Sequence, residues 1–227
     1  MMSSRDIRRK FGQNYLKDPA ILFEMGERIS PQEHDNFIEI GPGHGALTNQ
    51  INKKNINIIG IDIDSNNIEF LKKQFQKPAN FVFKNKDILQ YEMEDLDINY
   101  RIVGNLPYNI STQIILKLIN SYENIQDMHF LVQKEVAQKI VGTVSSKNWG
   151  KLAIKIATFF NCEILFNVPP DAFDIKPKVE SSFIRVMPKK DIDYDLSIKE
   201  QLFKVIDLAF SSRRKNIKNN LKNLNID

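Results

Sequence analysis

Short apolar runs typical of β-strands alternate with helical patterns along most of this 227-residue chain, and this alternation limits the possible folds more than any other feature. Strands are predicted at 36–40, 56–62, 81–83, 100–104 and 127–132, and helices at 19–29, 68–75, 111–122 and 134–143. Strands joined through helices pair in parallel, because the connection must cross over the sheet. The sequence therefore predicts an α/β fold with a mostly parallel sheet and helices on both faces.

The last third of the chain departs from this pattern. Two later strands, predicted at 161–167 and 179–187, are separated by a proline-rich loop rather than a helix, so we expect them to pair antiparallel at one edge. From Ser197 onward the pattern is helical only. We place the boundary near 189–196, which divides the chain into a domain of residues 1–190 and a helical segment of residues 191–227.

Composition excludes several classes of protein. With 42% hydrophobic and 26% charged residues the chain can build a core, which argues against disorder. No apolar run approaches the roughly 20 residues of a membrane-spanning helix, so we expect no membrane partner. The basic N-terminus lacks the apolar stretch of a secretion signal, and the single Cys162 suits the reducing cytoplasm. The scattered histidines and Cys162 have no metal-ligand spacing, so no metal is expected.

The formal net charge is only +4, but the basic residues gather near the two ends. A polyanion-binding enzyme would show such basic poles, although lysine-rich helix faces that are simply solvated would look the same. The candidate contacts to a nucleic acid are Arg8, Arg9, Lys10, Arg213, Arg214 and Lys215.

A glycine-rich turn follows the first predicted strand, in the segment Glu39-Ile40-Gly41-Pro42-Gly43-His44-Gly45. Glycines there allow positive φ angles and close approach of a ligand to the backbone. Asp62 ends the next strand, where a doubly wound fold places an acceptor for ribose hydroxyls. Together with Ala46 the turn also matches the dinucleotide fingerprint, so the turn alone does not separate a nicotinamide cofactor from S-adenosylmethionine.

A third carboxylate, Asp87, follows the third predicted strand. Glu39, Asp62 and Asp87 would then line one crevice at the carboxyl edge of the sheet. Acids at this edge suit the hydroxyls and the exocyclic amine of adenosine, and they would repel a pyrophosphate. This favours S-adenosylmethionine, although an aspartate at a strand end is also common as a helix cap.

The tetrapeptide Asn105-Leu106-Pro107-Tyr108 directly follows the fourth strand. The exocyclic amine of adenine is a poor nucleophile, because its lone pair is delocalised into the ring. The Asn105 side-chain oxygen and the Leu106 carbonyl could accept its N–H groups, while Pro107 fixes the local backbone. Tyr108 offers a face on which an extruded base can stack. These residue types predict methyl transfer to an adenine amine.

The sequence resembles the ribosomal RNA adenine N6,N6-dimethyltransferases, most closely the KsgA/RsmA type. The resemblance covers essentially the whole chain and rests on 11–16, 39–43, 104–112, 133–136, 169–173, 177–179 and 213–215. It implies a class I S-adenosylmethionine-dependent fold, Rossmann-like, with a mostly parallel seven-stranded sheet and a small, shortened C-terminal helical domain. It implies cofactor contacts from Gln13, Asn14, Leu16, Gly41, Asp62, Asp87 and Asn105, and two aromatic walls for the adenine from Tyr108 and Phe173. The glycine turn adds Glu39 and Gly43 to the expected cofactor contacts.

The implied activity is N6,N6-dimethylation of two adjacent adenines in a hairpin loop near the 3′ end of small-subunit (16S) rRNA. S-adenosylmethionine is consumed and S-adenosylhomocysteine is released, and the implied partner is the immature 30S subunit, whose maturation the family assists. We expect a monomer. A monomethylated amine has one N–H left, so Asn105 and Leu106 are interpreted as orienting groups. Members of the family usually have a fuller C-terminal domain, which places rRNA docking by this chain in question.

Two other functions remain open at this point. One is the related large-subunit (23S) rRNA adenine N6-methyltransferase of the macrolide-resistance type, which shares the glycine turn and the Asn-x-Pro-Tyr element. The segments 133–136 and 146–152 favour the small-subunit type. The other is a primarily non-catalytic ribosome assembly factor, which the basic ends of the chain would also suit.

Overall fold

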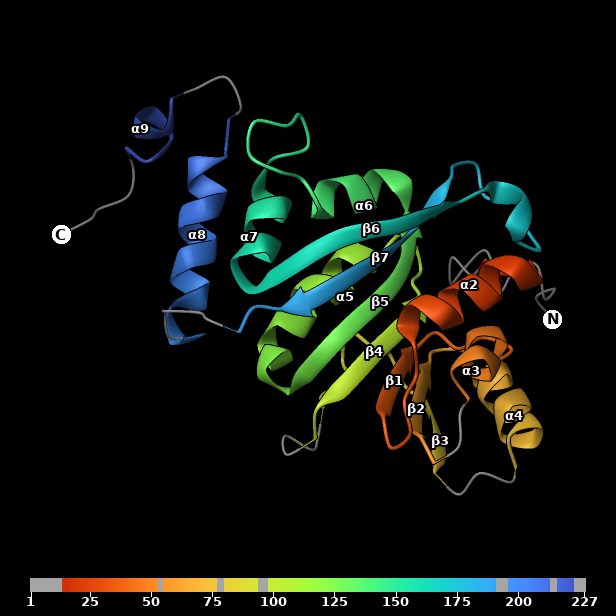
Figure 1. Ribbon diagram of the computed structural model, residues 1–227. Helices are drawn as coiled ribbons and strands as arrows, with labels where there is room; N and C mark the ends of the chain where they lie inside the picture. Colours follow the sequence, from red (N-terminus) through yellow and green to blue (C-terminus); the bar gives the residue numbers. More distant parts are fainter. Residues whose placement is uncertain are drawn as a thin grey trace.

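The computed structural model describes residues 14–52, 55–76, 80–93, 98–190, 196–212 and 216–222. Within these residues one seven-stranded sheet runs in the order β3-β2-β1-β4-β5-β7-β6 (Figure 1). The strands are β1 (Asn36–Ile40), β2 (Asn57–Asp62), β3 (Phe81–Asn85), β4 (Tyr100–Asn105), β5 (Ile125–Gln133), β6 (Phe160–Val168) and β7 (Ser181–Pro188).

The pairing of the strands confirms the predicted class of fold. β1, β2, β3, β4 and β5 pair in parallel, whereas β7 is antiparallel to both β5 and β6. The expected antiparallel pair at one edge is therefore present, with β7 inserted between β5 and β6. The strand order reverses at β1 and β4, and ligands of open α/β sheets bind at such a switch point, outside the carboxyl ends of the strands.

Helices cover both faces of the sheet. They are α2 (Pro19–Ile29), α3 (Ala46–Ile51), α4 (Ser65–Gln74), α5 (Ser111–Leu118), α6 (Lys134–Ile140), α7 (Lys151–Phe159), α8 (Lys199–Ala209) and α9 (Ile217–Asn220), with 3-10 turns at Ile119–Asn124, Pro170–Ala172 and Leu196–Ile198. The predicted helix 111–122 changes to 3-10 geometry after Leu118, and Ser121 leaves helical angles at φ −118° and ψ 21°. The predicted helix 134–143 ends at Ile140, just before Gly142.

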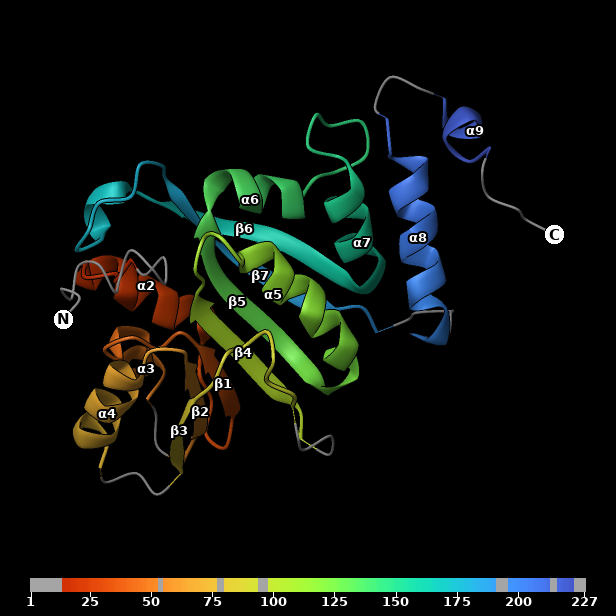
Figure 2. The same cartoon turned by 180° about the vertical axis from the view of Figure 1, so that it is seen from behind.

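Alternate residues of the strands divide the core into two layers. Phe37 of β1 packs with α2 and α3, whereas its neighbour Ile38 packs with α5, α6 and α7 on the other face. Val103 and Ile102 of β4 divide in the same way, because successive side chains of a strand point to opposite faces. Figure 2 shows α5 lying over the face of the sheet that α2 does not cover.

The segment Asn14–Asp18, which we call the strap, leads into α2 and pairs with a distant part of the chain. Leu16 forms a bridge with Phe173, and the backbone N–H groups of Lys17 and Asp18 both donate to the Ala172 carbonyl, at 2.9 and 3.1 Å. Asp18 then caps α2, because its side chain accepts from the N–H groups of Ala20 and Ile21. These contacts fix the strap beside the carboxyl end of β1.

Helix α8 packs against α7 at the far side of the molecule from β3 (Figure 1). The Phe203 ring meets the Phe159 ring edge-on at 6.1 Å, and the Lys155 ammonium lies 2.9 Å from an Asp207 carboxylate oxygen. Residues 191–195 lie outside the described residues, so the division into 1–190 and 191–227 stays a prediction. In the described part of the chain, every helix is too short or too polar to cross a bilayer.

Candidate active site

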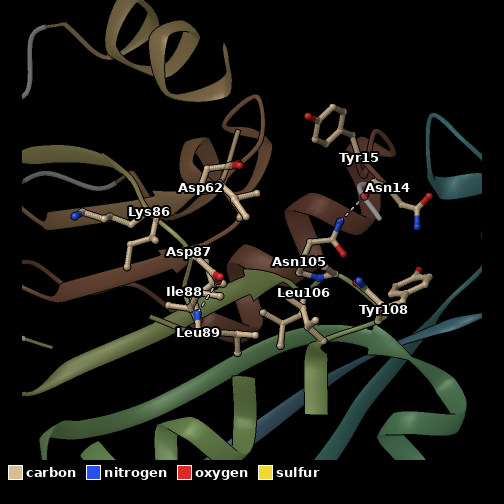
Figure 3. A pocket seen from close by; sticks show the side chains of 17 residues that line it. Asn14, Tyr15, Asp62, Lys86, Asp87, Ile88, Leu89, Asn105, Leu106 and Tyr108 are labelled. Carbon is tan, nitrogen blue, oxygen red and sulfur yellow. Dashed lines mark hydrogen bonds between the residues drawn. The ribbon is translucent and has the colours of Figure 1, made fainter. Parts of the chain in front are cut away.

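A cavity of about 240 Å³ opens at the carboxyl ends of β1, β2 and β4, at the switch point of the sheet. Figure 3 shows Asp62 and Asp87 on one side of it and Asn105, Leu106 and Tyr108 on the other, with the strap above. The lining residues are Asn14, Tyr15, Ile40, Gly41, Ile61, Asp62, Ile63, Lys86, Asp87, Ile88, Leu89, Asn105, Leu106, Pro107, Tyr108, Asn109 and Ile110. The chain thus brings most of the predicted catalytic and cofactor-binding residues to one place.

The glycine turn between β1 and α3 adopts backbone angles that favour glycine. Gly41, Gly43 and Gly45 have φ angles of 67°, 55° and 80°. Gly43 also has no room for a side chain, because an added Cβ would lie 2.7 Å from Cε1 of Tyr15. The turn is therefore in close contact with the strap.

Asp62 ends β2 as a buried carboxylate that organises the turn. Its Oδ2 accepts from the Gly43 N–H at 3.1 Å and from Asn67 Nδ2 at 3.0 Å, and its Oδ1 accepts from the Asp64 N–H at 2.9 Å. Burial raises the pKa of Asp62 above its usual range, and the three hydrogen bonds oppose that rise. A carboxylate fixed in this way can also accept from a ligand hydroxyl at the cavity.

Asp87 lies at the same side of the cavity, after β3. Its Oδ1 accepts from the Leu89 N–H at 2.9 Å, which closes a tight turn (Figure 3). Sequence reasoning did not single out the apolar residues Ile63, Ile88 and Leu89 beside the two acids. Their position in the sequence could have identified them as site residues, because they follow the predicted strand-end carboxylates. Acids flanked by aliphatic side chains fit an adenosine, whose base is flat and apolar and whose edges are polar.

Asn105 ends β4, and its amide has a defined orientation. Nδ2 donates to the backbone carbonyl of Asn14 at 2.7 Å, so the donor end of the amide faces the strap (Figure 3). The oxygen of the same amide points away from the strap, and it is the end available to a donor on a ligand. Leu106 is buried, and its N–H donates to the Leu131 carbonyl at 3.0 Å, which ties this turn to β5.

Tyr108 is half-buried at the edge of the cavity, two residues beyond the buried Leu106. Its hydroxyl lies 2.6 Å from Ser181 Oγ. Burial raises the pKa of Tyr108, so the phenol is neutral at physiological pH. The hydroxyl is therefore occupied by its hydrogen bond to Ser181, and the ring is held as a flat apolar surface.

Glu39 does not line the main cavity with the two other acids. It is 1% exposed, and its Oε2 accepts from Thr48 Oγ1 of α3 at 2.6 Å. The physical reason is strand alternation, which turns Glu39 to the same face as Phe37, toward α3. Burial raises the pKa of Glu39 to about 7. It borders a second cavity of about 250 Å³, which shares Tyr15, Gly41 and Asn105 with the first.

Phe173 and Leu16 also lie off the main cavity. Phe173 is 2% exposed, and its side chain belongs to the core layer formed with α2 and α3. In this structure the ring therefore does not face Tyr108 across the cavity. Leu16 is buried beside it and lines the second cavity. Gln13, Arg8, Arg9, Lys10, Arg213, Arg214 and Lys215 lie outside the described residues.

Tyr15 is a site residue whose place could not be seen in the sequence. Its hydroxyl donates to Asn67 Oδ1 at 3.1 Å, and Asn67 in turn donates to Asp62. Its ring packs at 4.7 Å from that of His44.

Among the described residues no group of three or more His, Cys, Asp or Glu side chains is arranged to hold a metal ion.

Comparison with known sequences finds relatives over nearly the whole chain. A model of the ribosomal RNA adenine dimethylase family matches residues 4–226. A ribosomal RNA small subunit methyltransferase A from Neisseria gonorrhoeae is 38% identical over 225 residues, which cover 98% of this chain and 86% of that protein. The protein of the same name from Coxiella burnetii is also 38% identical over 225 residues, covering 98% of this chain and 87% of that one.

Solved structures show the same fold. A dimethyladenosine transferase from Plasmodium falciparum superposes with a TM-score of 0.81 at 27% identity, covering 91% of this chain and 74% of that chain. The 23S rRNA methyltransferase ErmE superposes with a TM-score of 0.76 at 23% identity, covering 92% of this chain and 84% of that chain. The second likeness is one of fold alone, because its identity is low.

Proposed function

The chain belongs to the ribosomal RNA adenine dimethylase family, and from that premise we propose that it dimethylates N6 of two adjacent adenines in small-subunit rRNA. The methyl donor is S-adenosylmethionine, and the fold is that of the class I methyltransferases that use it. The relatives at 38% identity are named for the small subunit, which favours this substrate over the large-subunit alternative.

The residues at the main cavity fit the adenosine part of the cofactor. Asp62 would accept from the ribose hydroxyls, and Asp87 would accept from the exocyclic amine of the adenine. Ile63 and Ile88 would contact the faces of the base. Gly41 has no side chain, so the donor could approach the backbone closely there. The bound cofactor supplies an activated sulfonium methyl group, so the chain needs no side chain that activates the donor.

The chain's own contribution to the transfer is to orient the target amine. Asn105 Oδ1 and the Leu106 carbonyl would accept N–H groups of the adenine amine, which favours tetrahedral geometry at the nitrogen and directs its lone pair to the methyl group. The N–CH3 bond would form as the S–CH3 bond breaks to give S-adenosylhomocysteine, and the methylated nitrogen would then lose one proton to water. The bond from Asn105 Nδ2 to the Asn14 carbonyl holds the amide in the orientation that this requires. A monomethylated amine still has one N–H for either acceptor, so the same turn serves the second transfer.

Tyr108 supplies the surface on which the extruded adenine stacks, and stacking on an aromatic side chain is worth about 1–3 kcal/mol per base. Phe173 would complete an aromatic clamp only if its ring left the core layer, so the proposal rests on Tyr108. The basic residues near the two chain ends would contact rRNA phosphates.

The biological setting follows from this substrate. We propose that the chain acts in the cytoplasm on the immature 30S subunit and assists its maturation. We also propose that it acts as a monomer.

The observation that carries the proposal is the orientation of the Asn105 amide, with its oxygen left for a substrate amine. The test is transfer of labelled methyl from S-adenosylmethionine to unmethylated 30S and 50S particles, with primer extension to locate the product. We expect modification of 30S particles by the wild type and none by Asn105→Ala. Exclusive modification of 50S particles would contradict the proposed substrate.

A further inference from the structure

The ring of Tyr108 is fixed at two ends by elements far apart in the sequence. At its backbone end it follows Pro107, whose own φ is fixed by its ring. At its other end the hydroxyl lies 2.6 Å from the hydroxyl of Ser181. Ser181 is fully buried and begins β7, where it pairs with Gln133 of β5. The second anchor therefore belongs to a strand that is paired on both sides, with β5 and with β6.

We propose that Ser181 is a positioning residue, which holds the Tyr108 ring in the orientation that receives the extruded adenine. The inference rests on the proposed function, because it requires Tyr108 to bind the base. A side chain that is already ordered loses no rotamer freedom when its ligand arrives, and it holds the ligand in one geometry. Ser181 itself is not among the residues that line the cavity, and it acts only through Tyr108.

The neighbouring Ser182 provides a matched control. It is also fully buried on β7, and its Oγ donates to Asn167 Oδ1 of β6 at 2.8 Å. Because successive residues of a strand point to opposite faces, the Ser182 side chain lies on the other side of the sheet from Ser181. Ser182→Ala thus removes a buried serine hydrogen bond from the same strand without touching Tyr108.

The test is a double-mutant cycle of Tyr108→Phe and Ser181→Ala, measured as single-turnover methyl transfer to 30S particles. We expect each single variant to lower the rate by about tenfold, because misplacing a reacting group slows transfer while its binding persists. The double variant should be no slower than either single variant, since both remove the same bond. Ser181→Thr keeps a hydroxyl and should restore most of the rate, and Ser182→Ala should transfer methyl groups at the wild-type rate.

Two further measurements separate positioning from damage to the fold. Thermal unfolding should give similar losses of Tm for Ser181→Ala and Ser182→Ala, and calorimetry should give unchanged cofactor affinity for both. Losses of rate that add in the double variant, or an equal loss in Ser182→Ala, would overturn the role of Ser181. Inactivity of the wild type on 30S particles would instead overturn the proposed function, and this inference with it.

Discussion

The side-chain amide of Asn105 donates to the backbone carbonyl of Asn14 at 2.7 Å, and this bond joins the strap to the end of β4. It leaves the amide oxygen for the substrate and places the strap residue Tyr15 over the glycine turn. The groups proposed to hold the donor and those proposed to orient the acceptor are therefore parts of one connected structure.

Replacing Asn105 should affect transfer far more than binding. Asn105→Ala removes both the acceptor and the bond to the strap, and Asn105→Asp replaces the donor with a carboxylate that the Asn14 carbonyl repels. We expect both variants to lower the single-turnover rate by at least about 100-fold, the usual cost of losing a polar group that acts in the transition state. Binding to 30S particles, measured by filter retention, should stay near the wild-type level. Loss of 30S binding in parallel with activity would contradict this role.

Tyr108→Ala should weaken binding of the target adenine and leave the cofactor affinity unchanged. Loss of a stacking energy of about 1–3 kcal/mol corresponds to a decrease of about 5- to 150-fold in kcat/KM for the RNA. Isothermal calorimetry should give a cofactor Kd close to that of the wild type. An equally large loss of cofactor affinity would show that Tyr108 belongs to the donor site instead.

Asp62→Ala should have the opposite pattern, because Asp62 is the carboxylate proposed to bind ribose. A hydrogen bond to a charged group contributes about 1.5–3 kcal/mol, so we expect a cofactor Kd raised by about 10- to 150-fold. Leu89→Ala, at an apolar position of the same cavity, should raise it less. If Asp62→Ala bound S-adenosylhomocysteine as tightly as the wild type, the ribose contact would be wrong.

The contact between Gly43 and Tyr15 predicts different effects for two neighbouring glycines. Alanine at Gly41 or Gly43 would be strained by the positive φ, at a cost of about 1–3 kcal/mol each. Only at Gly43 would the new Cβ also meet Tyr15, at 2.7 Å, whereas at Gly41 the nearest atom, the Asn105 carbonyl oxygen, is 3.8 Å away. Chemical denaturation should therefore show Gly43→Ala to be the less stable variant. Equal stabilities would indicate that Tyr15 moves aside freely.

Glu39 makes the stability of the fold depend on pH. Burial raises its folded-state pKa to about 7 from 4.5, so the native state retains a proton that the unfolded chain loses. Its contribution is fully present below pH 4.5 and is lost as the pH rises toward 7, and the total is about 3 kcal/mol. Glu39→Gln keeps an acceptor for Thr48 without the charge. Urea unfolding should show the variant gaining stability over the wild type between pH 5 and pH 8, whereas a constant difference would contradict the raised pKa.

Much of the fold could be predicted because local patterns agree with the tertiary structure. The predicted strand 36–40 matches β1 in full, and Asp18 and Pro19 marked the start of α2 correctly. The order of the sheet and the place of β7 depend on long-range pairing, which no local pattern encodes. Arg101 illustrates the same limit. It is 5% exposed, and it bonds to Asp35 and Asp127 from two separate segments.

Some site residues could likewise be placed from local sequence patterns, whereas others depend on contacts between distant parts of the chain. Asp62, Asp87 and Asn105 could be placed at one edge because each follows a parallel strand. The place of Glu39 could not be predicted in this way. A shift of one position along the strand decides whether a side chain points to the cavity or to α3. Phe173 depends on how the strap pairs with 172–174, and that contact joins distant parts of the chain.

The most direct measurement of the central claim is mass spectrometry of nucleosides from unmethylated small-subunit rRNA, treated as 30S particles with the chain and isotope-labelled S-adenosylmethionine. We expect labelled N6,N6-dimethyladenosine at two adjacent positions near the 3′ end, formed by the wild type and absent with Asn105→Ala. Labelled methyl groups on carbon atoms or on ribose, or labelled N6,N6-dimethyladenosine formed at the wild-type rate by Asn105→Ala, would contradict it.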